Sequence, residues 1–231
     1  FRTIGLDSMQ GPVAGNYIAS QSPERVAIVH DKQQYGEGIA TAVRDTLQDA
    51  GIEIAMFEGI TAGDKDFSSL VTKIKQADVD YVYYGGYHPE LGLILRQARQ
   101  SDVDAKFTGP EGVGNKDINT IAGDAAEGLL VTLPPSFDEK DENQELVQAF
   151  EEKGEDPSGP FVLTSYTAVQ LIADGIEAAE STDPFDVAEA LRAGTFQTPI
   201  GTVEYDGKGD MESFEFVVYE WHSDGSKTPV N

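Results

Sequence analysis

Five stretches rich in β-branched and aromatic residues recur along the first half of the chain at nearly constant spacing. They begin near residues 25, 52, 79, 106 and 128, so successive starts lie 27, 27, 27 and 22 residues apart. Amphipathic segments with apolar residues at helical spacing separate them, as with Ile39, Val43 and Leu47. A strand, a crossover helix and their loops need about 30 residues. The pattern therefore predicts an α/β fold, with a doubly wound parallel sheet covered by helices on both faces.

The second half of the chain carries a different pattern, which begins where Pro134-Pro135 leads into an acidic, polar segment. Helices are expected from Asn143 to Gly154, from Phe161 to Ala179 and from Pro184 to Ala193. The middle helix has one broad apolar face, formed by Val162, Tyr166, Val169, Ile172, Ala173 and Ile176. Two short strands, GTVEYD from Gly201 and FEFVVYEWH from Phe214, flank a glycine-rich turn and predict a strand pair. A domain crossing is expected at the double proline.

Composition and charge exclude several classes of partner and site. The net charge is -25, so the surface repels nucleic acid and anionic membranes, although salt adaptation explains this acidity equally well. No cysteine is present, which removes disulfides, thiolate metal sites and cysteine nucleophiles. No apolar run approaches the roughly 20 residues that span a bilayer, so direct membrane insertion is not expected. The opening Phe1-Arg2-Thr3 resembles the interior of a longer protein.

The common catalytic and cofactor signatures do not appear in the sequence. GxSxG, a phosphate loop ending in GK[ST] and HExxH are all missing, and the glycine pairs near 36 and 112 lie among acids that disfavour phosphate. His30, Asp31 and His88 could meet at neighbouring strand ends as metal ligands, but ordinary loop roles are the better interpretation. We therefore expect no catalytic residue, no metal and no cofactor.

Three loop residues that follow separate predicted strands form the best candidate site. Tyr35 follows the first strand, Tyr87 the third and Glu111 the fourth. Parallel strands deliver their carboxyl ends to one edge of the sheet, so these side chains should converge. Glu111 could instead simply stabilise a helix N-terminus, and the two tyrosines could be half-buried core residues. A carboxylate between aromatic rings suits a small cation such as an α-ammonium group.

Several sequence blocks resemble the leucine/isoleucine/valine-binding proteins of bacterial ABC importers, which have the type I periplasmic binding fold. The resemblance runs through the whole chain, and its blocks are HDKQQYGEG from His30, GITAGDKDFSSLV from Gly59, YVYYGGYHPE from Tyr81, ILRQAR from Ile94, GPEGV from Gly109, AEGLLVTLP from Ala126, DPSGPF from Asp156 and SFEFVVYEWH from Ser213.

The resemblance implies an amino-acid ligand enclosed between two lobes. It implies that Glu111 holds the ligand ammonium, that Tyr87 and Tyr35 line the same wall, and that Phe161 touches the aliphatic side chain. Without the resemblance, Phe161 would be taken as a core residue. The preferred amino acid stays open.

The resemblance also implies a domain arrangement and a biological role. Residues 1–133 plus 213–231 would form one complete α/β lobe, and residues 134–212 a partial, mostly helical second lobe. Family members carry about a third of their length before the equivalent of Phe1, so we expect this chain alone to bind ligand weakly or not at all. The implied role is that of an extracytoplasmic solute-binding component, periplasmic or on the cell surface, whose partner is a membrane permease. An amino-acid or amide sensing domain of a receptor is the alternative, and an enzyme on the same fold is a more distant one.

Overall fold

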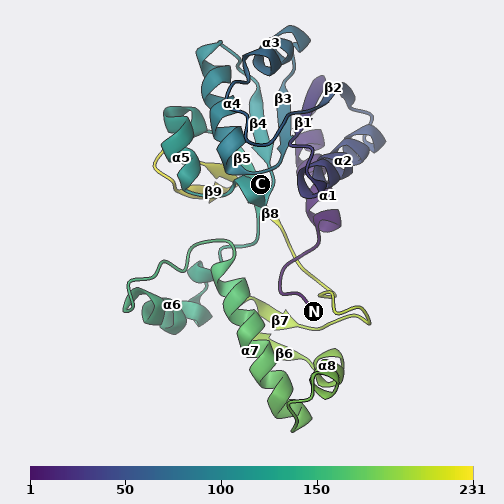
Figure 1. The fold of residues 1–231 in the computed structure, drawn as a ribbon, viewed down its shortest axis with the longest axis vertical. Coiled ribbons are helices and arrows are strands. Elements are labelled where there is room, and N and C mark those ends of the chain that lie inside the picture. Colours follow the sequence, from purple (N-terminus) through teal and green to yellow (C-terminus); the bar gives the residue numbers. More distant parts are fainter. Residues whose placement is uncertain (231) are drawn as a thin grey trace. The chain divides into compact units, whose positions relative to one another are not determined.

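A seven-stranded sheet organises the larger part of the molecule, and the computed structural model describes residues 1–230 (Figure 1). Its strand order is β2-β1-β3-β4-β5-β8-β9. The strands are β1 (Arg25–His30), β2 (Glu53–Gly59), β3 (Tyr81–Gly85), β4 (Lys106–Gly109), β5 (Leu129–Leu133), β8 (Val217–Trp221) and β9 (Lys227–Pro229). The first five run parallel, and β8 and β9 are antiparallel to their neighbours. The predicted doubly wound α/β sheet is confirmed.

Helices cover both faces of this sheet (Figure 1). The helices of this part are α1 (Asp7–Ser20), α2 (Gln34–Asp49), α3 (Ser68–Ala77), α4 (His88–Gln100) and α5 (Asp117–Ala122). Val26 and Ile28 of β1 pack in one apolar cluster with residues of α1 and α2, whereas Ala27 and Val29 pack in another with residues of α3, α4 and α5. Strands buried on both faces require the continuous apolar runs seen in the sequence.

The end of α2 shows how the sequence sets the length of these units. Gly51 has φ of +79°, a left-handed conformation that glycine adopts without a Cβ penalty. Its N–H donates to the Gln48 carbonyl at 2.9 Å, and the Ile52 N–H donates to the Leu47 carbonyl at 3.0 Å. This paired arrangement closes the helix and redirects the chain into β2.

The chain divides into two compact units, and the sheet with its helices forms one of them, residues 6–133 and 216–231. The other unit contains residues 1–5 and 134–215. Its helices and strands are α6 (Gln144–Glu151), α7 (Val162–Ala179), α8 (Pro184–Ala193), β6 (Phe196–Thr198) and β7 (Gly201–Val203), preceded by the short turns η3 (Phe137–Glu139) and η4 (Asp141–Asn143). Its core gathers Leu163 and Leu171 of α7, Leu191 of α8 and Val203 of β7.

The predicted pairing of the strands near 201 and 214 is wrong. Gly201–Val203 pairs antiparallel with Phe196–Thr198, inside the smaller unit. The later strand begins at Val217 and pairs with β5 of the large sheet, where Val131 lies opposite Tyr219. The glycine-rich segment between them is therefore a passage from one unit to the other.

The apolar face predicted for α7 also differs from the buried one. Leu163, Thr164, Thr167, Leu171 and Gly175 are buried, whereas Val169 is 69% exposed and Ile172 is 55% exposed. The helix interior is apolar on more than one side, so composition alone did not show which side faces the core.

None of the helices within residues 1–230 is both long enough and apolar enough to cross a bilayer.

Candidate functional site at the carboxyl edge of the parallel strands

The order of the parallel strands, β2-β1-β3-β4-β5, reverses direction between β1 and β3. The crossover after β1 leads outward to β2, toward one edge of the sheet. The crossover after β3 leads to β4, toward the other edge. In open α/β sheets such a reversal leaves a crevice beyond the carboxyl ends of the two strands, where ligands bind. The segments that follow β1, β3 and β4 border this edge, and Tyr35, Tyr87 and Glu111 lie in them.

The structure brings the two tyrosine rings together across the reversal point. Tyr35 lies in the first turn of α2, and Tyr87 is the N-cap residue of α4. Their ring centroids are 5.3 Å apart with an interplanar angle of 38°. Tyr35 is half-buried, whereas Tyr87 is 47% exposed. The pair forms an aromatic wall, one ring of which faces solvent.

Glu111 follows β4 and starts a single 3₁₀ turn, η1 (Glu111–Val113), after Pro110. Its side chain is largely withdrawn from water, and its Oε2 is buried without a hydrogen-bond partner among the residues that the structure describes. Burial, with the charge of Asp7 as a further cause, raises the pKa of Glu111 to about 7. The carboxyl group therefore has an unused acceptor atom and would gain from a cationic partner.

Gly112 connects this turn to the aromatic wall. Its N–H donates to the Tyr35 hydroxyl at 3.3 Å. A Cβ at Gly112 would lie 2.8 Å from the Gly86 carbonyl oxygen and 3.1 Å from ring carbons of Tyr35 and Tyr87. Only glycine therefore permits this close approach of η1 to both rings.

The pKa shifts of the tyrosines at this edge have causes in common. Burial and then the charge of Glu111 raise the pKa of the Tyr35 phenol. Burial also raises the pKa of Tyr83 on β3, with further contributions from Tyr35, Asp7 and Glu111. The carboxyl groups of Asp7 and Glu111 thus both disfavour ionisation of these phenols.

Asp7 and Tyr83 interact electrostatically with the candidate residues, and the sequence analysis did not single them out. Asp7 is the first residue of α1, and its sequence position indicated only a helix cap. Tyr83 lies within the buried run of β3, where aromatic residues are usually core. Its hydroxyl is buried with no hydrogen-bond partner in the described part of the chain. The sequence analysis treated the whole run as a buried strand, and no sequence signal distinguished Tyr83 from Tyr81, whose side chain packs on the same face.

Phe161, the fourth predicted ligand residue, belongs to the other unit. It is the N-cap residue of α7, and its side chain is 49% exposed. An exposed ring at this position contradicts the purely residue-based assignment of Phe161 to the core.

The residues considered as metal ligands have local roles. Asp31 is 1% exposed and its Oδ1 accepts a hydrogen bond from the Gln33 N–H at 2.8 Å. His30 is 6% exposed, and its Nδ1 accepts from the Lys32 N–H at 3.2 Å. Both side chains shape the turn that leads into α2 and thereby position Tyr35.

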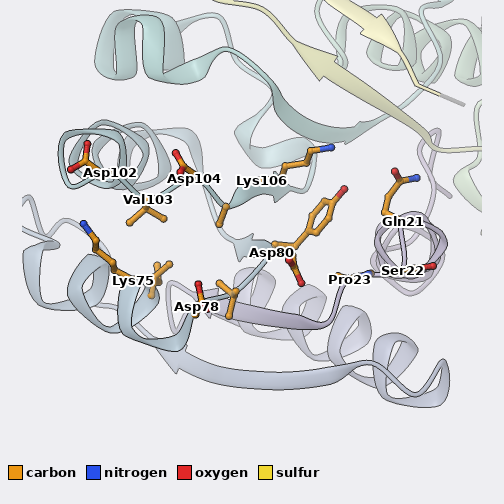
Figure 2. A pocket seen from close by; sticks show the side chains of 14 residues that line it. Gln21, Ser22, Pro23, Lys75, Asp78, Asp80, Asp102, Val103, Asp104 and Lys106 are labelled. Atoms are coloured by element: carbon orange, nitrogen blue, oxygen red, sulfur yellow. The ribbon is translucent and has the colours of Figure 1, made fainter.

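A hollow of about 630 Å³ lies at the opposite, amino edge of the same strands (Figure 2). It is lined by segments that precede β1, β3 and β4, among them residues 21–23, 78–81 and 102–106. Asp80 is already engaged there, because its Oδ2 accepts from the N–H groups of Glu24 and Arg25 at 2.7 and 3.1 Å. Glu111 and the two rings are absent from its lining, so this hollow is separate from the candidate site.

Known proteins are similar to this chain in sequence and in fold. The family described as periplasmic binding protein matches residues 1–226. The Leucine-, isoleucine-, valine-, threonine-, and alanine-binding protein of Pseudomonas aeruginosa is 59% identical over all 231 residues, which cover 62% of that protein. The Leu/Ile/Val-binding protein of Escherichia coli is 50% identical over 228 residues, 98% of this chain and 62% of that protein. The chain thus spans 62% of the length of these curated relatives.

Among solved structures, a leucine binding protein of Thermotoga maritima matches with a TM-score of 0.88 and 26% identity, over 98% of this chain and 65% of that chain. A branched-chain amino acid transporter substrate binding protein of Streptococcus pneumoniae, in complex with isoleucine, matches with a TM-score of 0.85 and 23% identity, over 98% of this chain and 66% of that chain. The second likeness concerns the fold alone.

Proposed function

The chain belongs to the periplasmic binding protein family, and on that premise we propose that it is the solute-binding component of an ABC importer for a branched-chain or related amino acid. The observation that carries this proposal is the buried, unpartnered Oε2 of Glu111 beside the rings of Tyr35 and Tyr87. The relatives supply the ligand class, since they are named as binding proteins for leucine, isoleucine and valine.

In this proposal Glu111 accepts charge-assisted hydrogen bonds from the ligand ammonium group. Such bonds are stronger than neutral ones, and the partly desolvated surroundings of Glu111 increase the gain. Asp7 adds a second negative charge to the edge, which favours a cation and disfavours an isolated carboxylate ligand. The rings of Tyr35 and Tyr87 provide an apolar wall with cation–π attraction of about 0.5 to 2 kcal/mol. Phe161 is proposed to contact the aliphatic side chain of the ligand.

The remaining parts of the proposal concern architecture and partners. We propose that residues 1–133 with 213–231 form a complete lobe, and that residues 134–212 are the mostly helical part of a second one. The exposed side chains of Val169 and Ile172 on α7 support this, because large apolar side chains that are exposed together often mark a surface that other residues cover in the whole protein. The protein would work outside the cytoplasm, in the periplasm or at the cell surface, deliver its ligand to a membrane permease, and perform no bond chemistry.

A titration of the 231-residue chain with leucine, followed by amide NMR, tests this proposal. We expect weak, saturable binding that perturbs the amides of Tyr35, Tyr87 and Gly112. The Glu111→Gln variant should bind about 1.5 to 3 kcal/mol more weakly, because a charged hydrogen-bond partner is lost. Asp49→Asn is the matched control, since it removes one exposed charge at the far end of α2. Equal binding by the Glu111→Gln variant would remove Glu111 from the site.

A further inference from the structure

A second group of ligating side chains lies at the opposite edge of the large sheet. Glu127 precedes β5, Glu220 lies on β8 and His222 follows β8 directly. One carboxylate oxygen from each acid and a ring nitrogen of the histidine lie within 4.8 Å of one another. We propose that these three side chains form a binding site for a transition-metal dication of the zinc type. This inference does not depend on the proposed function.

The donor set selects the metal. A neutral imidazole with two carboxylates suits zinc and its first-row neighbours, whereas calcium and magnesium prefer oxygen ligands alone. Donors bound tetrahedrally at about 2.1 Å lie about 3.4 Å apart, so atoms that are 4.8 Å apart have to approach by about 1.4 Å, which requires rotation of the side chains. His222 Nδ1 and Glu127 Oε1 are already 3.0 Å apart. Water would complete the coordination.

Neighbouring groups hold two of the ligands in place. The Glu127 Oε2 accepts a hydrogen bond from the Ser223 N–H at 2.8 Å. The His222 Nε2 lies 3.0 Å from the Thr228 Oγ1, so an Nε2–H donated to that hydroxyl leaves Nδ1 free for a metal. Metal-binding histidines usually have such a partner on their second nitrogen, because it fixes the ring and its tautomer.

The backbone of His222 is anchored as well. The Asn119 Nδ2 donates to the His222 carbonyl at 2.9 Å, and the Asn119 Oδ1 accepts from the Trp221 indole N–H at 2.9 Å. These bonds connect the end of β8 to α5. Among the described residues, no lysine or arginine forms an ion pair with Glu127 or Glu220, and the ion-pair partner of Glu127 is His222 itself. A metal ion bound between His222 Nδ1 and Glu127 Oε1 would replace the direct contact that these two atoms make in this structure.

The only tryptophan of the chain, Trp221, gives a localised readout. Paramagnetic Co²⁺ quenches indole fluorescence at short range, so a cobalt ion at His222 would quench Trp221, whereas ions spread over the acidic surface would not. We expect saturable quenching at one equivalent, reversal by a chelator, and displacement of Co²⁺ by Zn²⁺ but not by excess Ca²⁺. Bound Zn²⁺ should also raise the melting temperature, because it binds the folded chain and joins the segment before β5 to the end of β8.

Two variants and one control decide the matter. His222→Gln and Glu127→Gln should each weaken Co²⁺ binding about tenfold or more. Glu127 has a side chain that is 53% exposed, so its replacement leaves folding intact even if the His222 variant proves unstable. Glu189→Gln removes one exposed acid of the other unit and should change nothing. Quenching that fails to saturate, or that is the same in the Glu127→Gln variant, would show an adventitious ion only and overturn the proposal.

Discussion

Glu111 is the residue on which both ligand binding and pH dependence are expected to depend. Burial raises its pKa from 4.5 to about 7. Between these two pH values the unfolded chain loses the Glu111 proton while the folded chain keeps it, so ionisation favours the unfolded state. This contribution disfavours folding progressively as the pH rises from about 4.5 to about 7, and it is constant above that range.

A comparison of the wild type with the Glu111→Gln variant isolates this effect. Glutamine keeps the shape of the protonated acid, so the variant should have nearly the wild-type unfolding free energy at pH 4.5. At pH 8 it should be more stable than the wild type by at most about 3 kcal/mol, because 2.5 pKa units correspond to about that value. Urea unfolding at several pH values measures the difference. A difference that stays constant from pH 4.5 to 8 would contradict the raised pKa.

Tyr87 distinguishes a role of the ring from a role of the hydroxyl. If the ring forms the wall for the ligand, Tyr87→Ala should weaken leucine binding by about 0.5 to 2 kcal/mol, whereas Tyr87→Phe should leave it nearly unchanged. Neither change should greatly affect stability, because the side chain is 47% exposed. Ligand titrations of both variants make the test. Equal losses in the two would assign the role to the hydroxyl.

Gly112 tests the close packing of the site. An alanine Cβ there would press on the Gly86 carbonyl and both tyrosine rings, so Gly112→Ala should cost about 1 to 3 kcal/mol of unfolding free energy. Gly38→Ala is the control, because nothing lies within 4 Å of its Cβ position within α2. There alanine should stabilise the chain by about 0.5 to 1 kcal/mol. Equal stability of the Gly112→Ala variant and the wild type would contradict this geometry.

The sequence was sufficient for residues whose position follows from strand ends. The sequence predicted that Tyr35, Tyr87 and Glu111 lie close together, because each follows a strand of one parallel sheet. Asp7 could not, because α1 precedes the first strand and its docking depends on contacts with α2 and β5 that no local pattern encodes. A role for Tyr83 could not be predicted either, because aromatic residues in a buried strand are usually core residues.

At the scale of elements, α7 offers a test of which face is buried. Leu171 is 2% exposed and packs in the core of the smaller unit, so Leu171→Ala should cost about 2 to 5 kcal/mol. Val169 belongs to the face predicted from the sequence but is 69% exposed, and Val169→Ala should change the unfolding free energy by less than about 0.5 kcal/mol. Denaturant unfolding of the two variants, which shorten apolar side chains on different sides of one helix, measures this. A greater loss from Val169→Ala would restore the predicted face.

Strand pairing shows where sequence reasoning at this scale fails. The parallel strands begin at 25, 53, 81, 106 and 129, close to the predicted starts, because buried runs and a Gly stop such as Gly51 are local signals. The strand at Val217 was paired with the wrong partner, since a turn-rich segment between two strands suggests a hairpin. Its actual partner, β5, lies more than 80 residues earlier in the chain, and such a choice depends on the exposed edge of a sheet already formed.

At the scale of the whole molecule, the proposal is that the larger unit provides the part of a binding site that recognises an ammonium group. The net charge of -25 adds a general attraction for cations, so specificity has to be separated from charge. Ligands with the same aliphatic tail but different charged groups distinguish specific recognition of the ammonium group from this general attraction.

The most direct measurement is therefore an NMR titration of the 231-residue chain with three ligands: leucine, 3-methylbutylamine and 4-methylpentanoate. The amine keeps the ammonium and the aliphatic tail, and the acid keeps the carboxylate and the tail. We predict that leucine and the amine bind at the amides of Tyr35, Tyr87 and Gly112, and that the acid does not. Binding of the amine should weaken in the Glu111→Gln variant and persist in Asp49→Asn. Binding of 4-methylpentanoate as strong as that of the amine, or amine binding indifferent to Glu111→Gln, would contradict the account.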